Sequence, residues 1–375
     1  MSDNLANSVR RVLLTADSVG GVWTYATTLC REFERRDIEV VLALMGPAMA
    51  DDQRRSLPPN VTLCENQFRL EWMEAPWDDV RRAGDWLLGL ERRHAPDVVH
   101  LNSYAHGALP WRAPTIAVAH SCVLSWWREV RGEDAPPEWR RYAEEVRAGL
   151  AGVQRVVAPT RWMAAAVQEL HGPLPHIEVV SNGLEARADG TREKEPFILG
   201  VGRLWDEAKN YRLLTRTAQP LPWPVRLAGD ARSPDGEAAV FDGFELLGRL
   251  APEAVGELYD RASIFVLPAR YEPFGLAVLE AAQAGCALVL GDIPSLRENW
   301  QDAAVFVSPD DPEAFRAELC RLAAGSLSQR QLGDAARKRA AEFTAQRMAE
   351  SYLAIYAALR PATATAAPAS LAISR

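Results

Sequence analysis

The sequence predicts an α/β protein built from two doubly wound parallel sheets with a cleft between them. Short apolar segments of strand character alternate with amphipathic helical segments along nearly the whole chain, which is typical of parallel sheets covered by helices on both faces. The alternation stops over residues 184–195, which have no apolar period, and restarts at residue 196. A length of 375 residues also fits two domains of ordinary size.

The first half supplies the elements of the first predicted sheet. Each strand is a short apolar run, and each helix carries apolar residues at helical spacing. The predicted strands cover residues 11–16, 39–44, 97–101, 115–119, 155–158 and 177–180. The predicted helices cover residues 22–34, 76–93, 137–151 and 161–170.

The second half repeats the pattern. Its predicted strands cover residues 196–202, 225–228, 245–247, 263–268, 287–290 and 304–307. A helix is predicted over 276–284 and a helical pattern over 328–359. The expected units are a first domain, a second domain, a final helix for which a return to the first domain is left open, and a disordered tail. Their limits are 1–188, 189–345, 346–360 and 361–375.

Composition narrows the classes of protein to consider. The formal net charge of −8 argues against a nucleic-acid-binding protein, which would carry a basic excess. No apolar run reaches the roughly 18 residues that span a bilayer. The polar start, Met1 to Asn4, lacks a signal-peptide pattern. We therefore expect a soluble cytoplasmic protein, and docking on a membrane surface stays open.

Cysteine and lysine usage adds two observations. The cysteines are odd in number, scattered and without a Cys-x-x-Cys pair, which indicates reduced thiols rather than disulfides or a zinc site. They are Cys30, Cys64, Cys122, Cys286 and Cys320. Lysine occupies only three of the 42 basic positions, so a lysine inside a motif is informative.

The most informative motif is a pair of carboxylates around a predicted strand-to-helix turn. Glu272 follows the strand 263–268, and Glu280 lies two turns into the next helix. Between them Gly275 stands at the helix N-terminus, where bare backbone N–H groups and partial positive charge suit a phosphate. A nucleotide sugar needs this arrangement, with acceptors for hydroxyls at both ends and an anion site in the middle.

A pair of cations follows the first strand of the second half. Arg203 and Lys209 lie in the segment 200–210, directly after the predicted strand 196–202. A leaving diphosphate needs its charge neutralised, and a paired arginine and lysine supply this without a metal.

These motifs, in this order, resemble the family-four retaining glycosyltransferases over about residues 10–355. The resemblance implies the GT-B fold of two facing Rossmann-like domains and a nucleotide sugar as donor substrate. It implies that Arg203 and Lys209 stabilise the leaving diphosphate. It further implies that Glu272 binds hydroxyls of the donor sugar and that Glu280 binds the nucleotide ribose. The backbone that should face phosphate or sugar is that of Phe274, Gly275 and Leu276.

A glycine turn follows the first strand of the chain. Gly20 and Gly21 lie where a helix starts, and glycine there lets the backbone approach a ligand closely. The turn lacks the Gly-x-Gly-x-x-Gly pattern of dinucleotide binding. The resemblance implies that this loop lies over the donor phosphate and near the acceptor, with Asp17 and Ser18 close by. A plain β–α turn would also use glycine.

His120 and His100 both end predicted strands of the first sheet. The resemblance implies that His120 contacts the donor sugar from across the cleft, whereas a structural role is favoured for His100. The family often has aspartate after this histidine. Ser121 stands there instead, which leaves the role of a neighbouring carboxylate open.

Weaker motifs complete the candidate site. The resemblance implies that the backbone near Leu250 meets the base and that Glu298 lies near the ribose. Asn182-Gly183 predicts a turn that requires positive φ. Most tryptophans are expected in the core, but aromatic faces pack against sugars, so an acceptor wall is the hypothesis for three of them. These are Trp126, Trp127 and Trp139.

The resulting hypothesis is a retaining glycosyltransferase of the hexosyltransferase class, without cofactor or metal. The donor is a uridine or guanosine diphosphate sugar, and the acceptor is a saccharide, a lipid-linked molecule or a small molecule. Three alternatives remain: a nucleotide-sugar epimerase, a catalytically silent nucleotide-sugar-binding protein, and a nicotinamide dehydrogenase. An epimerase would need further acid/base carboxylates, and a dehydrogenase would need the missing glycine pattern.

Overall fold

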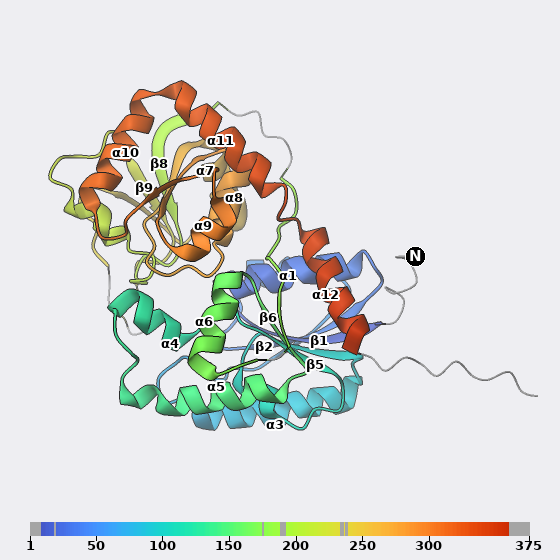
Figure 1. Ribbon diagram of the computed structural model, residues 1–375. Coiled ribbons are helices and arrows are strands. Elements are labelled where there is room, and N and C mark those ends of the chain that lie inside the picture. The colour runs from blue at the N-terminus through green and yellow to red at the C-terminus, as the bar shows by residue number, and fades with distance from the viewer. Residues whose placement is uncertain are drawn as a thin grey trace, which may run out of the picture.

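The computed structural model describes residues 9–18, 20–174, 176–187, 193–232, 236 and 239–359. They form two α/β domains, each around one parallel sheet, so the predicted fold class is confirmed (Figure 1). Every predicted strand is present, and no end shifts by more than one residue. The expected boundary at residues 188 and 189, the polar start and the tail 361–375 lie outside the described residues.

The first sheet has the strand order β3-β2-β1-β4-β5-β6-β7. All its pairs are parallel; β1 and β2, for example, pair in register from Arg11↔Glu39 to Asp17↔Met45. The sequence pattern missed β3. Its residues are only partly buried or exposed, whereas the central strands are almost entirely buried. The strands are β1 Arg11–Asp17, β2 Glu39–Met45, β3 Val61–Glu65, β4 Val98–Leu101, β5 Thr115–Val118, β6 Arg155–Ala158 and β7 Ile177–Val179.

Helices cover both faces of the first sheet (Figure 1). One apolar cluster joins the sheet to α1 and α12, and two others join it to α3, α5 and α6. The predicted helix 137–151 begins instead as a 3₁₀ turn, Pro137–Trp139, before α5. The helices are α1 Gly21–Glu34, α2 Asp51–Arg55, α3 Trp77–His94, α4 Val123–Trp126, α5 Arg140–Gly152 and α6 Arg161–His171.

The second sheet has the order β10-β9-β8-β11-β12-β13 and is also parallel throughout its named strands. Its strands and the helices packed on them share one apolar core. The strands are β8 Glu195–Val201, β9 Val225–Ala228, β10 Glu245–Gly248, β11 Ala262–Leu267, β12 Ala287–Gly291 and β13 Val305–Val307. The helices are α7 Pro252–Arg261, α8 Leu276–Gln283, α9 Pro294–Trp300, α10 Pro312–Ala324 and α11 Ser326–Ala340.

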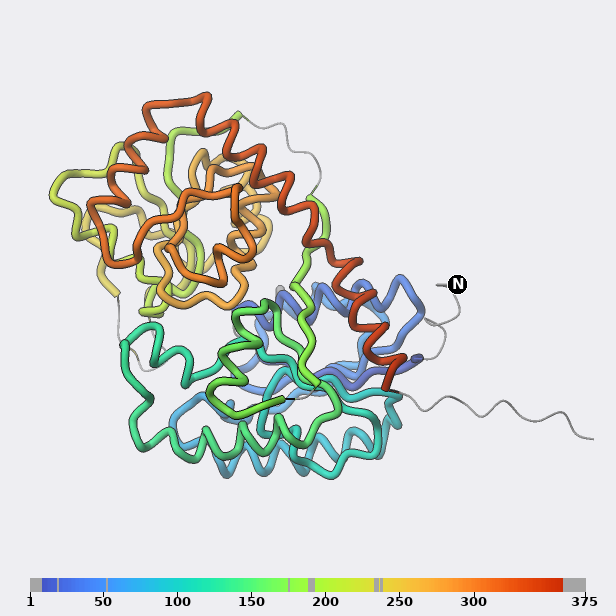
Figure 2. Tube along the Cα trace, in the orientation of Figure 1, coloured from blue at the N-terminus to red at the C-terminus, as the bar shows by residue number. Residues whose placement is uncertain are grey.

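The helical pattern expected over 328–359 is present as two helices, because the chain crosses between domains there. It breaks into α11 and α12, Ala345–Leu359, and α12 packs on α1 of the first domain. At the break, Ala345 N donates to the Leu184 carbonyl at 2.9 Å, beside the other crossing (Figure 2).

Gly183 explains why the crossings lie so close together. The expectation that it needs positive φ is wrong, since it is absent from the residues with that conformation. Glycine is needed here because there is no room for a side chain. A Cβ on Gly183 would lie 2.1 Å from the Thr344 carbonyl oxygen.

Candidate functional site

The best-supported candidate site lies where the order of the second sheet reverses. β8 and β11 are neighbours, and the chain leaves them in opposite directions along the sheet. Ligands of such sheets bind at the carboxyl ends of the strands at this point. Arg203 and Lys209 follow β8, and Glu272 follows β11, so the fold brings these predicted residues to one edge.

Each of the two cations is held by a carboxylate. Lys209 Nζ forms an ion pair with Glu272 Oε2, and both side chains are largely buried. Arg203 Nη2 lies 2.7 Å from Asp206 Oδ2. Burial alone would raise the pKa of Asp206, but the positive charges of Arg203 and Lys209 outweigh it and hold that pKa below its ordinary value. Sequence reasoning missed Asp206, although its spacing of three from Arg203 was a usable signal.

The start of α8 is the turn at which the sequence predicts an anion site. Gly275 caps the helix with φ of 90°, a conformation that favours glycine. The Phe274 carbonyl accepts a hydrogen bond from Asn299 Nδ2 at 3.1 Å, and its ring packs against Phe343. The Phe274 carbonyl is therefore already engaged by a side chain of α9.

Glu280 lies further along α8, away from the ion pairs. Its Oε2 accepts a hydrogen bond from the Tyr259 hydroxyl at 3.1 Å, and burial raises the pKa of Glu280. Its partners therefore differ from those of Glu272, which bonds a lysine. The two glutamates are in different electrostatic surroundings on one loop and helix.

The glycine turn of the first domain meets the second domain at this site. A Cβ on Gly20, whose φ is 69°, would lie 3.3 Å from Arg203 Nη1. A Cβ on Gly21 would lie 3.5 Å from Leu276 Cδ1. The structure thus brings together predicted residues from both domains.

His120 also lies at the carboxyl edge of the first sheet. Its Nε2 is 2.8 Å from Asn102 Oδ1, and its ring contacts that of Tyr25 edge-on at 4.5 Å between centroids. Burial lowers the pKa of His120 to about 3. His100 is enclosed instead, with Nε2 bonded to Tyr25 and Nδ1 to Tyr356, which fits the structural role expected for it.

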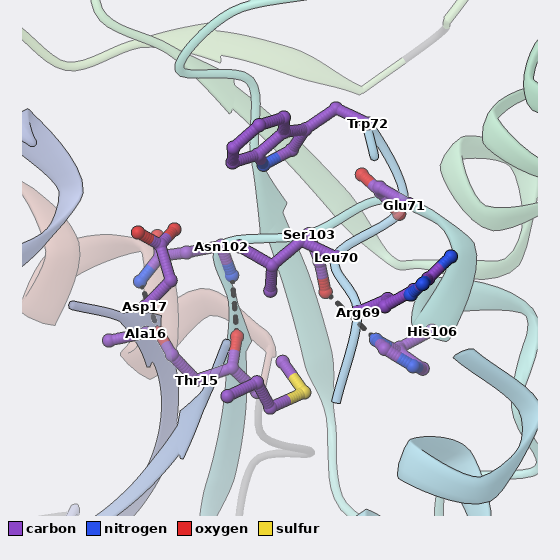
Figure 3. A pocket seen from close by; sticks show the side chains of 11 residues that line it. Thr15, Ala16, Asp17, Arg69, Leu70, Glu71, Trp72, Asn102, Ser103 and His106 are labelled. Carbon is purple, nitrogen blue, oxygen red and sulfur yellow. Dashed lines mark hydrogen bonds between the residues drawn. The ribbon is translucent and has the colours of Figure 1, made fainter. Parts of the chain in front are cut away.

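A cavity of about 40 Å³ lies at the reversal point of the first sheet, between the ends of β1 and β4 (Figure 3). Trp72, with 37% of its surface exposed, lies over Asp17 and Asn102 in this view. Sequence reasoning missed Trp72 at this cavity, because it stands in a loop without periodic neighbours. The lining residues are Thr15, Ala16, Asp17, Met45, Arg69, Leu70, Glu71, Trp72, Asn102, Ser103 and His106.

The three tryptophans expected to form an acceptor wall lie elsewhere than this cavity. Trp126 and Trp127 contact each other edge-on, and Arg131 lies over both rings. Trp139 packs on Tyr142 beside the first domain's core. Among the described residues, the ring contacts of these tryptophans are with one another, with Arg131 and with Tyr142, and none is with His120.

Two weaker candidates are also placed away from the cations. Leu250 follows β10, the edge strand of the second sheet, and is partly buried against its core. The carboxylate of Glu298 accepts hydrogen bonds from Arg161 N at 2.8 Å and Trp162 N at 3.0 Å. Glu298 therefore caps α6 of the first domain, a helix that lies far from it in the sequence.

The loop that carries Glu272 is anchored to the first domain on both sides. The Tyr271 hydroxyl accepts a hydrogen bond from Cys122 N at 2.9 Å and lies 2.9 Å from Ser125 Oγ. Thr160 Oγ1 donates to the Pro273 carbonyl at 3.1 Å. Sequence reasoning missed Tyr271, because a contact across about 150 positions leaves no local pattern.

Clusters of metal ligands and membrane-spanning helices are both absent from the described residues. No group of three or more His, Cys, Asp or Glu side chains there is arranged to hold a metal ion. Among the helices within the described ranges, none is both long and apolar enough to cross a membrane.

Comparison with known families covers most of the chain. Residues 19–187 match the family described as glycosyltransferase family 4, and residues 195–324 match glycosyl transferases group 1. A glycogen synthase of Mycobacterium tuberculosis is 28% identical, over 78% of this chain and 76% of its own. A D-inositol 3-phosphate glycosyltransferase of Geodermatophilus obscurus is 27% identical, over 92% of this chain and 86% of its own.

Solved structures share the fold. A sucrose-phosphate synthase of Thermosynechococcus elongatus superposes with a TM-score of 0.76 at 18% identity, covering 93% of this chain and 99% of its own. HepE of Anabaena, solved in complex with UDP-glucose, gives a TM-score of 0.70 at 15% identity, covering 92% of this chain and 98% of its own.

Proposed function

The chain belongs to the family-four glycosyltransferases and has their GT-B fold, and from this we propose that it transfers a hexosyl group from a nucleoside-diphosphate sugar to an acceptor with retention of configuration. The observation that carries the proposal is the meeting of Arg203, Lys209 and Glu272 at one sheet edge, with Gly20 of the other domain against Arg203. We propose a uridine or guanosine diphosphate as the carrier.

Leaving-group stabilisation is the main task of the site. When the bond between the anomeric carbon and the β-phosphate oxygen breaks, negative charge develops on the diphosphate. Arg203, Lys209 and the N-terminus of α8 offer positive charge to it, so the site needs no metal in this proposal. The diphosphate competes with Glu272 for Lys209 and with Asp206 for Arg203.

Bond formation takes place on the face that the leaving group vacates. The acceptor oxygen bonds to the anomeric carbon, and its proton passes to the departing phosphate oxygen. Glu272 and His120 hold the sugar from the two domains and act as positioning groups, and Glu280 holds the ribose. Closure of the domains excludes water and limits hydrolysis of the donor.

The first test is activity on a donor panel. Purified protein is incubated with UDP- and GDP-hexoses and saccharide, lipid-linked and small-molecule acceptors, and products are found by mass and their anomeric configuration by NMR. We expect Arg203→Ala and Lys209→Ala each to lower kcat about 100- to 1000-fold, as for loss of one transition-state donor. Arg321→Ala, which removes an exposed cation on α10, is the control. Undiminished turnover in the double variant, an inverted product or an epimerised donor contradicts the proposal.

Substitutions of the two glutamates should change different quantities, kcat for Glu272 and the affinity for the nucleoside diphosphate for Glu280. Glu272→Gln weakens the hold on the sugar, so kcat falls, and it removes the carboxylate that competes with the diphosphate for Lys209, so the dissociation constant of the free nucleoside diphosphate does not rise. Glu280→Gln loses a charged hydrogen bond to ribose, so that dissociation constant rises roughly tenfold or more. Calorimetry with UDP and GDP, beside steady-state kinetics, gives both quantities. Equal losses of both in each variant would contradict the division of roles.

A further inference from the structure

A chain of hydrogen bonds leads from β1 to His120 through Asn102. Asn102 N donates to Thr15 Oγ1 at 2.8 Å, and Asn102 Nδ2 donates to the Thr15 carbonyl at 2.6 Å (Figure 3). On its other side Asn102 Oδ1 lies 2.8 Å from His120 Nε2. The side chain of Asn102 is therefore fixed at both ends by groups of the first sheet.

The Thr15 carbonyl decides the orientation of the Asn102 amide. A backbone carbonyl can only accept, so the amide atom that faces it must be the NH₂ group. The flipped amide would set two acceptors against each other at 2.6 Å. Oδ1 must then face His120, and Nε2 of His120 must carry the hydrogen that lies between them.

The surroundings keep the His120 ring neutral. Burial lowers the pKa of His120 to about 3. Tyr25 from α1 contacts its ring and His100 from β4 interacts with it, and neither of these groups supplies a negative charge. Burial raises the pKa of Tyr25 far above its ordinary value and lowers that of His100 to about 3.

A neutral imidazole with hydrogen on Nε2 has a lone pair on Nδ1. In the part of the chain that the structure describes, Nδ1 of His120 makes no hydrogen bond. His120 lies at the carboxyl edge of the first sheet, and its partner Asn102 forms part of the cavity wall there. Nδ1 is thus the one polar atom of the ring left for a ligand.

We propose that Asn102 is a positioning residue that fixes His120 as the Nε2–H tautomer, so that Nδ1 accepts a hydrogen bond from a hydroxyl of the transferred sugar. This step rests on the proposed function, in which His120 faces that sugar. It specifies the ligand chemistry: the group opposite Nδ1 is a donor, and a deoxy, fluoro or carboxylate group at that position loses the bond.

The tautomer can be measured without any activity. In the wild-type protein labelled with ¹⁵N-histidine, NMR from about pH 5.5 to 8 should show His120 as the neutral Nε2–H form throughout. The signal is assigned by its loss in His120→Gln. An Nδ1–H tautomer, or protonation of His120 within this range, overturns the proposal even if the protein is an active transferase.

The second arm is the pH profile of Asn102→Asp. A carboxylate facing Nε2 favours the imidazolium, whose Nδ1 becomes a donor. Activity of Asn102→Asp should therefore fall roughly tenfold as the pH is lowered from about 8 to 5.5, on an acid limb that wild type lacks. Asn102→Ala should lower kcat/KM without gaining this limb.

The control is Asn60→Asp, since Asn60 Nδ2 also donates to backbone carbonyls, those of Cys30 and Ile38, away from the site. Its pH profile should run parallel to that of wild type. If Asn102→Asp also runs parallel to wild type, or if Asn60→Asp gains the same limb, the positioning role is wrong. Failure of wild type to transfer any sugar would refute the proposed function, and the NMR result would still decide the tautomer.

Discussion

At the scale of single residues, the two cations expected at the diphosphate are each paired with a carboxylate of the same domain. The partner of Lys209 is Glu272, so one side chain of the ion pair serves the phosphate and the other the sugar in the proposed function. An arrangement of this kind couples the two subsites, because phosphate that attracts Lys209 also releases Glu272 toward the sugar.

The sequence singled out Arg203, Lys209 and Glu272 because they stand in local motifs at strand ends. It could not predict Asn102 as the partner of His120, because the two belong to different strands and meet only through the sheet. The position of Asn102 after the buried strand 98–101 was the available signal. Polar residues at that edge are worth testing even where no motif surrounds them.

His100 provides a prediction about stability at the residue scale. Tyr356→Phe removes the hydroxyl bonded to buried His100 Nδ1, and leaving that group unsatisfied should lower the free energy of unfolding by about 1–3 kcal/mol. Urea denaturation measures the change. Tyr352→Phe is the matched control on the same helix, because the Tyr352 hydroxyl forms no hydrogen bond with His100. An equal loss in both variants would argue against the role of the bond.

At the scale of elements, periodicity located the strands well because each central strand is a continuous buried run. It does not show where a tertiary contact interrupts a helical pattern. The helical pattern over 328–359 continues through residues 341–344, yet the backbone there is taken by the crossing at Leu184. Helical propensity carries no information about a strand-like contact with a segment far away in sequence.

The start of α8 gives a prediction for an element. Gly275→Ala puts a Cβ at φ of 90°, 3.0 Å from Val278 Cγ2 and 3.4 Å from Leu296 Cδ2. Left-handed backbone costs a non-glycine residue about 1–2 kcal/mol, and the contacts add to this. We expect lower stability and weaker binding of UDP or GDP, measured by denaturation and calorimetry.

Gly132→Ala separates strain from site effects. Gly132 has φ of 72°, and a Cβ there would meet no atom within 4 Å. It should therefore show only the cost of backbone strain, with nucleotide binding unchanged. If Gly132→Ala weakens nucleotide binding as much as Gly275→Ala does, the effect of Gly275 is not specific to the N-terminus of α8.

At the scale of the whole molecule, each sheet reverses its strand order at the point that faces the other domain's site residues. Asp17 and Asn102 lie at the reversal of the first sheet, and Arg203 and Glu272 at that of the second. The sequence predicted two sheets and a cleft, but not which loops join across it, since those contacts depend on how the domains dock.

Through Tyr271, the contact between the two domains should affect the rate of sugar transfer. This residue precedes Glu272 in the chain, and its hydroxyl joins Cys122 N and Ser125 Oγ of the first domain. Tyr271→Phe keeps the ring that packs on Trp162 but removes this bond. We expect kcat to fall roughly 2- to 10-fold, the value of one hydrogen bond, with little change in the affinity for UDP or GDP.

The control for this last prediction is Tyr142→Phe. The Tyr142 hydroxyl also accepts a backbone N–H, that of Val123 at 3.3 Å, but both residues belong to the first domain. Both variants should lose stability, and Tyr271→Phe should lose more, because its hydroxyl bonds the buried Cys122 N–H and Ser125 Oγ, whereas the Val123 N–H is only partly buried. Only Tyr271→Phe should lower kcat, since only Tyr271 adjoins Glu272 across the interface. A kcat loss of the same size in Tyr142→Phe would mean that general loosening of the first domain, and not the placement of Glu272, limits turnover.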